Sequence, residues 1–165
     1  WDRSARELME AGFNMILPNV LRAGVAHYPS ELLPTSDTFL EYGDQMLQCV
    51  RAAHKYGLEV HAWKMNWNLE GAPRQFKAEL REAGRMQVSR TGDSIDWLCP
   101  SHPENVRLEL GSLVELAERY SVDGIHLDYI RYPGTEGCYC DNCRQRFSRT
   151  VPQSVSVGPN SRYPG

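Results

Sequence analysis

Helix-like and strand-like segments alternate along this chain of 165 residues, and this alternation restricts its fold more than any other feature. The predicted helix–strand pairs are residues 2–11 with 13–17, 44–56 with 58–64, and 101–120 with 125–130. In the third helix, the apolar residues at helical spacing are Val106, Leu110, Leu113, Val114 and Ala117. Strands that alternate with helices predict a parallel sheet with right-handed crossovers, so we assign the chain to the α/β class.

The connections between these elements differ greatly in length. Each helix is joined to the following strand by a few residues, such as Gly12 or Gly57, whereas the strand-to-helix connections are long. Residues 65–100 form the longest of them, and residues 73–83 within it have the pattern of a short helix. Long loops at the carboxyl ends of parallel strands build the active sites of such folds, so side chains that end a strand are the first functional candidates.

The faces of the predicted strands favour a barrel over an open sheet. His61 and Trp63 share one face of the second strand, and His126 and Asp128 share one face of the third. An open sheet covered by helices tends to be apolar on both faces, whereas polar side chains near the strand ends are typical of a barrel mouth. Because a (β/α)8 barrel needs about 250 residues, three strands predict part of a TIM barrel.

Composition and charge exclude several functions. The 18 basic residues against 21 acidic ones give a net charge of −3, which lacks the basic footprint of a nucleic-acid-binding protein. No apolar run approaches the roughly 18 residues that a membrane-spanning helix needs. With 41% hydrophobic and 24% charged residues, the chain has the composition of a folded globular protein. The oligomeric state is left open.

Three of the five cysteines lie within six residues, at Cys138, Cys140 and Cys143. Thiolates at this spacing can supply three of the four tetrahedral ligands of zinc. Cys99, on the preceding strand-to-helix connection, lies on the same predicted rim and could be the fourth. Such a zinc site would be structural, and we expect no catalytic cofactor. A disulfide, in an exported protein, and reduced thiols are the alternatives.

Four sequence blocks follow one another at residues 24–34, 53–63, 97–104 and 122–133, the last being Val-Asp-Gly-Ile-His-Leu-Asp-Tyr-Ile-Arg-Tyr-Pro. Together they resemble the glycosyl-hydrolase-like 10 family of bacterial TIM-barrel proteins. The resemblance implies a (β/α)8 barrel, carbohydrate hydrolysis, and export to the periplasm, the cell surface or the exterior.

Under this resemblance, the three visible strands would be strands two to four of the barrel, within a domain fragment over residues 1–149. Residues 150–165, which are rich in Ser, Pro, Gly and Val, are predicted to form an irregular tail. The first strand would precede Trp1 and strands five to eight would follow Gly165. We therefore expect residues 1–165 alone to be inactive.

Asp128 is the predicted catalytic carboxylate. It ends the third visible strand, and glycoside hydrolysis uses two carboxyl groups, one of which acts as a nucleophile or a base. Alternatively, Asp128 caps its loop or pairs with Arg131, which could also orient the carboxylate or bind a hydroxyl or an acidic group of the substrate. We expect the general acid on a later strand, because no visible candidate stands out. The acidic residues considered are Glu31, Glu70, Asp93 and Asp96.

Aromatic and polar side chains around these strand ends are predicted to bind sugar. Flat rings stack on the apolar faces of sugars, while polar side chains bond to the hydroxyls. The predicted binding residues, besides Arg131, are Tyr28, His61, Trp63, Asn66, Trp67 and His126. The alternative for each of them is a place in the core or under a loop.

These patterns predict a fragment of a glycoside hydrolase that cleaves O-glycosidic bonds in an oligo- or polysaccharide. Bacterial glycans, including cell-wall strands, are substrates by resemblance alone, and the sequence does not distinguish retention from inversion. The alternatives are a non-catalytic carbohydrate-binding barrel and an interaction module stapled by zinc or a disulfide.

Overall fold

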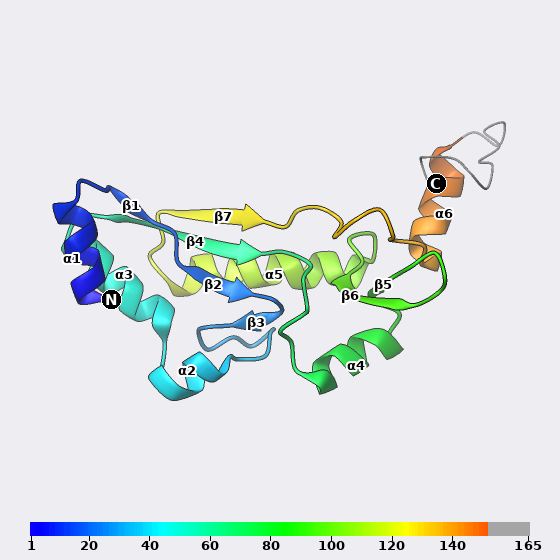
Figure 1. The fold of residues 1–165 in the computed structure, drawn as a ribbon, viewed down its shortest axis with the longest axis horizontal. Coiled ribbons are helices and arrows are strands. Elements are labelled where there is room, and N and C mark those ends of the chain that lie inside the picture. The colour runs from blue at the N-terminus through cyan, green and yellow to red at the C-terminus, as the bar shows by residue number, and fades with distance from the viewer. Residues whose placement is uncertain (152–165) are drawn as a thin grey trace.

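The computed structural model describes residues 1–151, which contain a parallel sheet with β4 (Glu59–Met65) at its centre (Figure 1). Along one edge, β4 pairs in parallel with β1 (Met15–Ile16) and β2 (Asn19–Arg22). Along the other edge it pairs in parallel with β7 (Gly124–Asp128). The predicted parallel sheet is therefore confirmed, and the carboxyl ends of its strands meet at one edge.

The first predicted strand consists of two pieces. Ile16 in β1 pairs with Val60, and pairing resumes in β2 at Asn19, opposite Trp63. Pro18 lies between the pieces and cannot donate a ladder hydrogen bond, because it has no backbone N–H. Its carbonyl still accepts a hydrogen bond from the Trp63 amide at 2.9 Å. The strand therefore continues past the predicted boundary towards the carboxyl edge of the sheet.

Three helices pack on one face of this sheet. They are α1 (Asp2–Glu10), α3 (Gln45–Lys55) and α5 (Pro103–Arg119), and each coincides with a helix predicted from apolar spacing. Apolar side chains of these helices and of the strands form the main core. Its buried members include Ala5, Met46, Cys49, Val50, Val60, Ala62 and Leu116.

Helix α5 turns a different side to the sheet from the one its apolar spacing indicates. Its buried residues are Asn105, Glu109, Ser112 and Leu116. The predicted apolar stripe is largely exposed, with Val106 at 46%, Leu110 at 60% and Val114 at 44%. Polar side chains thus lie between α5 and the sheet, and they form the network described below.

Side chains near the helix ends determine where two of these helices begin. Asp44, the predicted N-cap of α3, accepts a hydrogen bond from the Leu47 amide at 2.9 Å. The sequence also predicts a capping box that starts at Ser101, but the N-cap of α5 is His102. Its Nδ1 accepts a hydrogen bond from the Glu104 amide at 3.2 Å, so α5 begins one residue later than predicted.

The long connection after β4 has more structure than the sequence indicates. Its predicted short helix is α4 (Arg74–Glu82), which is followed by an unpredicted antiparallel hairpin. The hairpin consists of β5 (Met86–Val88) and β6 (Ser94–Leu98). A second core joins α4 to this hairpin, and its buried members are Leu69, Ala72, Leu80, Met86 and Leu98.

The connection after β2 and the end of the described chain contain three further elements. They are β3 (Val25–Ala26), which pairs antiparallel with β2, α2 (Asp37–Tyr42) and α6 (Asp141–Thr150). Thr150, the first residue of the predicted tail, belongs to α6, and residues 152–165 lie outside the described residues. No helix within residues 1–151 is long and apolar enough to cross a bilayer.

Burial alternates along β4 and confirms the predicted faces. Ala62 and Lys64 are buried on the helix side, whereas His61 and Trp63 are half-buried on the opposite face. His126 in β7 is the register partner of Trp63 and shares its face. The face opposite these helices therefore carries the polar and aromatic side chains that the sequence predicts for the inside of a barrel.

Candidate functional site

Asp128 ends β7 at the carboxyl edge of the sheet, and its hydrogen bonds come from two neighbouring segments. The indole Nε1 of Trp63 donates to Oδ2 at 3.2 Å, and the backbone amide of Tyr129 donates to Oδ1 at 2.7 Å. The Asn66 amide donates to the Asp128 carbonyl at 2.8 Å, which fastens the end of β4 to the end of β7. Each carboxylate oxygen is thus oriented by one donor, Oδ2 from the central strand and Oδ1 from the residue that follows β7.

The Trp63 ring contacts this carboxylate, and the His126 ring contacts Trp63 in turn. The rings of Trp63 and His126 meet edge to face, with centroids 6.1 Å apart and planes at 87°. His61 lies on the same face towards the amino end of β4, where its Nε2 is 3.4 Å from the Glu59 carboxylate. The structure therefore brings Trp63 and His126 to Asp128 and leaves His61 nearer the opposite end. Sugar binding by these side chains stays a prediction.

Arg131 forms no ion pair with Asp128 within the described residues. Its guanidinium carbon lies 4.8 Å from the centre of the Tyr129 ring, a cation–π contact. Trp97 stacks on the same ring, with centroids 5.4 Å apart and planes at 6°. The suggested Asp128–Arg131 pair is therefore replaced by a stack of Trp97, Tyr129 and Arg131, which we call the rim stack.

Asn66 faces the helix layer and not the exposed face of the sheet. It is 4% exposed, and its Nδ2 donates a hydrogen bond to Oε2 of Glu109 at 2.7 Å. The Nζ of Lys64 lies 3.1 Å from the same oxygen and also donates to Ser112. Burial lowers the pKa of Lys64, and the Glu109 carboxylate opposes that shift. The Asn66 side chain therefore fastens α5 to the end of β4 and is not open to a sugar.

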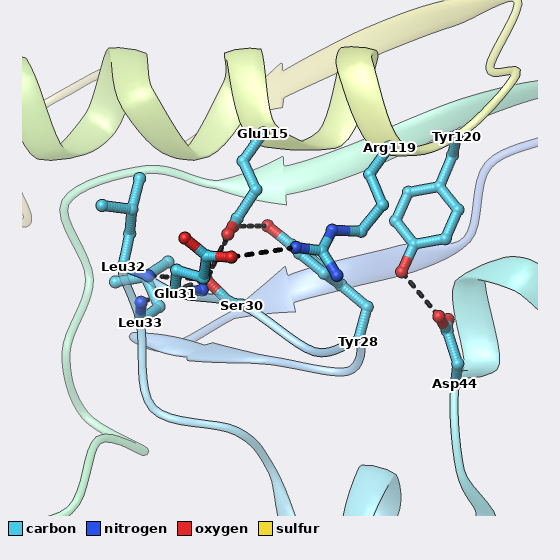
Figure 2. A network of polar contacts seen from close by, with 9 residues as sticks. All are labelled: Tyr28, Ser30, Glu31, Leu32, Leu33, Asp44, Glu115, Arg119 and Tyr120. Atoms are coloured by element: carbon cyan, nitrogen blue, oxygen red, sulfur yellow. Dashed lines mark hydrogen bonds and ion pairs between the residues drawn. The ribbon is translucent and has the colours of Figure 1, made fainter.

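Tyr28 is a core residue without exposed area. Its hydroxyl donates to Oε2 of Glu115 at 3.0 Å, and its ring meets Tyr120 edge-on at 5.7 Å. Figure 2 shows that Glu115 also accepts hydrogen bonds from the Ser30 hydroxyl and the Glu31 amide, each at 2.7 Å. Burial, reinforced by the Glu115 charge, raises the pKa of Tyr28 well above its usual value. This burial is incompatible with stacking on a sugar, and Tyr28 instead anchors its loop to α5.

Trp67 lies under the long connection. Its backbone is left-handed, with φ of 65°, and its half-buried ring packs against the second core. Its amide donates a long hydrogen bond of 3.4 Å to Glu109. These contacts match the loop-packing alternative for Trp67, while its half-exposed ring leaves sugar binding as a prediction.

Two of the acidic residues considered as the partner acid, Asp96 and Glu31, contact basic side chains. Asp96 accepts a hydrogen bond from Lys77 at 2.7 Å, and the Glu31 carboxylate lies 3.7 Å from Arg119. Within residues 1–151, none of the considered acids contacts Asp128. The assignment of the general acid to a later strand stays a prediction.

Cys99, Cys138, Cys140 and Cys143 come together beside the hairpin, and we call them the cysteine cluster. Their Sγ atoms all lie within 4.8 Å of one another, and the Cys99 sulfur is 3.4 Å from Cys140 and 3.5 Å from Cys143. A tetrahedron with metal–sulfur bonds of about 2.3 Å has edges of about 3.8 Å. The four free thiols therefore have the spacing needed to hold a metal ion.

Hydrogen bonds within the cysteine cluster separate the acidities of its thiols. A hydrogen bond with Cys99 lowers the pKa of Cys138 to about 5, and the same bond raises the pKa of Cys99. Burial raises the pKa of Cys140 to about 11. The Val88 amide also donates to the Cys138 sulfur at 3.4 Å. Cys138 is therefore the most readily ionised of these three thiols, and the thiolate is the form that binds metals.

Sequence reasoning missed Trp97, Tyr129 and Glu109. Strand alternation would place Tyr129 on the face opposite Asp128, but the strand ends there and Tyr129 adopts a left-handed φ of 56°. Trp97 belongs to a hairpin that the sequence did not reveal. The burial of Glu109 was not predicted, because the apolar spacing of α5 indicated a different buried side. One usable signal was Trp97 itself, an aromatic residue in a run of alternating polar and apolar residues.

A parallel sheet with helices on one face, and with aromatic and carboxylate side chains at its carboxyl edge, is the architecture of TIM-barrel glycosidases. The chain belongs to the Glycosyl hydrolase-like 10 family, whose model matches residues 2–156. It is 29% identical over 149 residues to Glycosyl hydrolase DigH of Escherichia coli K12 and of Shigella flexneri. These matches cover 78% of this chain and 34% of each relative, so the chain spans about a third of the length of the curated relatives it matches.

Solved structures with a similar fold include two glycosidases. A β-galactosidase from Rahnella sp. R3 superposes with a TM-score of 0.62 at 22% identity, over 89% of this chain and 21% of that one. An α-fucosidase from Thermotoga maritima gives 0.53 at 13% identity, over 77% and 28%. A hypothetical protein from Ruminiclostridium thermocellum gives 0.55 at 16% identity, over 94% and 90%. The similarity to the two glycosidases confirms the predicted fold class. This chain covers only part of each of them, as expected for part of a TIM barrel.

Proposed function

We propose that the protein containing this chain is a glycoside hydrolase that cleaves O-glycosidic bonds in an oligo- or polysaccharide. The family is glycosyl-hydrolase-like, and the curated relatives carry the name glycosyl hydrolase. A β-galactosidase and an α-fucosidase in complex with fucose share the fold. The observation that carries the proposal is Asp128, held at a strand end by Trp63 and placed on the face without helices.

Asp128 supplies one of the two carboxyl groups in this proposal. Either one of its oxygens attacks the anomeric carbon, or it removes a proton from the water that attacks there. The second carboxyl group, which protonates the leaving oxygen, comes from a later strand. His126 and Arg131 bond to sugar hydroxyls, and the exposed part of the Trp63 ring contacts an apolar sugar face.

Bacterial glycans, including cell-wall strands, are the substrates that we propose to test first. We also propose that the protein is exported to the envelope or beyond it, where such glycans are accessible. Cell fractionation with an antibody against the protein tests the location, and a cytoplasmic protein would contradict it. Zinc is the metal that we assign to the cysteine cluster, because four thiolates in a closed tetrahedral set are typical of structural zinc sites.

The decisive experiment compares the wild type with Asp128→Asn in the full-length protein. Glycan hydrolysis, followed by chromatography of the products, should fall by at least about a hundredfold, because the variant lacks a catalytic carboxylate. Asp37→Asn, at an exposed residue in the first turn of α2, serves as the matched control. Undiminished hydrolysis by Asp128→Asn contradicts the proposal. Glycan binding without hydrolysis by the wild type favours a non-catalytic carbohydrate-binding barrel.

A further inference from the structure

The cysteine cluster joins two segments that lie far apart in the sequence. Cys99 directly follows β6, whereas the other three cysteines lie between β7 and the first turn of α6. Backbone contacts bring these segments together, because the Tyr139 amide donates to the Val88 carbonyl at 2.8 Å. The segment that follows β7 is thereby attached to the β5–β6 hairpin at the end of the segment that leads into α6.

The rim stack attaches the same segment to the hairpin at the start of the segment, directly after β7. Trp97 lies in β6, two residues before Cys99, and stacks on Tyr129, the residue that follows Asp128. Residues 132–136, between Arg131 of the rim stack and the cysteine cluster, are all exposed. This stretch has little burial of its own, so the rim stack and the cysteine cluster fix its position.

We propose that a metal ion bound by the cysteine cluster holds the chain after β7 against the hairpin and thereby maintains the rim stack. Each cysteine binds as a thiolate and releases its proton to solvent. The metal-bound sulfurs fix Cys99 relative to Cys138, and this in turn keeps Trp97 facing Tyr129. The Tyr129 amide donates a hydrogen bond to the Asp128 carboxylate. By holding Tyr129 in place through Trp97, the four cysteines act as positioning residues for that carboxylate. Only this last step rests on the proposed function.

The test uses the full-length protein and zinc as the probe. Zinc per chain is measured by mass spectrometry after dialysis, for the wild type, Cys143→Ser and the matched control Cys49→Ser. Cys49 is a cysteine buried in the main core, outside the cysteine cluster. The wild type and Cys49→Ser should each retain about one zinc ion per chain, as a closed four-thiolate site binds one ion. Cys143→Ser should retain none.

Near-ultraviolet circular dichroism reports the rim stack, and Trp97→Phe identifies its contribution. Removing zinc from the wild type with a chelator under reducing conditions should lower the signal to that of Trp97→Phe, and added zinc should restore it. This arm needs no cysteine variant, so misfolding of Cys143→Ser would not obscure it. An unchanged signal after zinc removal overturns the link to the rim stack, and a wild type without zinc overturns the metal site. Neither readout uses a glycan, so a failure of the glycosidase proposal is recorded separately.

Discussion

The indole Nε1 of Trp63 donates a hydrogen bond to Oδ2 of Asp128 across 3.2 Å, so the central strand of the sheet orients the carboxylate that ends its neighbour. Through this contact Trp63 can orient the carboxylate, a role that an aromatic ring without a donor could not fill. A Trp side chain combines a large apolar surface with one N–H donor, and here the donor is directed at the candidate catalytic group.

Trp63→Phe should lower kcat more than it changes KM for glycan hydrolysis by the full-length protein. The variant keeps an aromatic ring and loses the donor to Asp128. A hydrogen bond to a charged group contributes about 1.5–3 kcal/mol, which corresponds to roughly a tenfold to a hundredfold change in rate. Steady-state kinetics check this prediction, with Trp1→Phe as the control because the Trp1 indole donates its hydrogen bond to Gln45 and not to Asp128. An effect confined to KM would mean that Trp63 acts on the substrate only.

Tyr28→Phe should lower the free energy of unfolding by about 1 kcal/mol and leave glycan binding unchanged, because the lost hydroxyl bonds to Glu115 in the interior. Denaturant unfolding and binding titrations measure the two effects. Tyr42→Phe is the matched control, at a ring that is 62% exposed. A loss of glycan affinity at unchanged stability would return Tyr28 to the list of binding residues.

Lys64→Met should destabilise the protein by about 3–5 kcal/mol, because it leaves the Glu109 carboxylate buried without its cation. The double variant Lys64→Met with Glu109→Gln should recover much of this loss, since no charge is then left unpaired. Lys55→Met removes an exposed pair with Asp2 and should change stability little. If the double variant were as unstable as the single one, the cost would lie in packing and not in the unpaired charge.

Asp123 should make a contribution to the free energy of unfolding that is lost in acid. The Val60 amide, and then His54, hold the pKa of Asp123 below its usual value of 3.8. A carboxyl group whose pKa is lower in the folded state stabilises the protein above the unfolded pKa, and this contribution is lost as the pH falls through the folded pKa. Asp123→Asn should therefore be less stable than the wild type at pH 5.5, and the gap should begin to narrow as the pH falls below about 3.8.

Urea unfolding between pH 5.5 and pH 3 measures that gap for Asp123→Asn. Glu70→Gln, at an exposed carboxylate, is the matched control and should follow the wild type throughout. A gap that stays constant down to pH 3 would show that the amide substitution perturbs the strand and that the charge is unimportant.

The sheet and the place of Asp128 could be predicted because they follow from local patterns. Strand alternation determines which side chains share a face, and chain order determines which end of a parallel strand builds the site. Tyr28 could not be assigned in this way, because an aromatic residue near a strand end looks the same in sequence whether it faces a ligand or the core. Its burial depends on Glu115, which is 87 residues away in the chain.

Other features depend on tertiary contacts that no local pattern reveals. The strands β5 and β6 are three and five residues long, so the alternation around Trp97 is too brief to predict a strand by itself. Helix α5 carries its most regular apolar spacing on the side away from the sheet. The side that faces the sheet instead carries the buried polar network of Glu109. The cysteine cluster was foreseen because metal ligands follow characteristic spacings, whereas the stacking of Trp97 on Tyr129 has no sequence signature.

The outer edge of β7 affects how this chain behaves in solution. Among the described strands, β7 pairs only with β4, and Leu127 and Ile130 near its carboxyl end are 44% and 67% exposed. An open strand edge beside exposed apolar side chains can pair with a strand of another molecule. When residues 1–165 are prepared alone, we therefore expect reversible self-association that increases with concentration, which sedimentation velocity would detect as a rising mean mass.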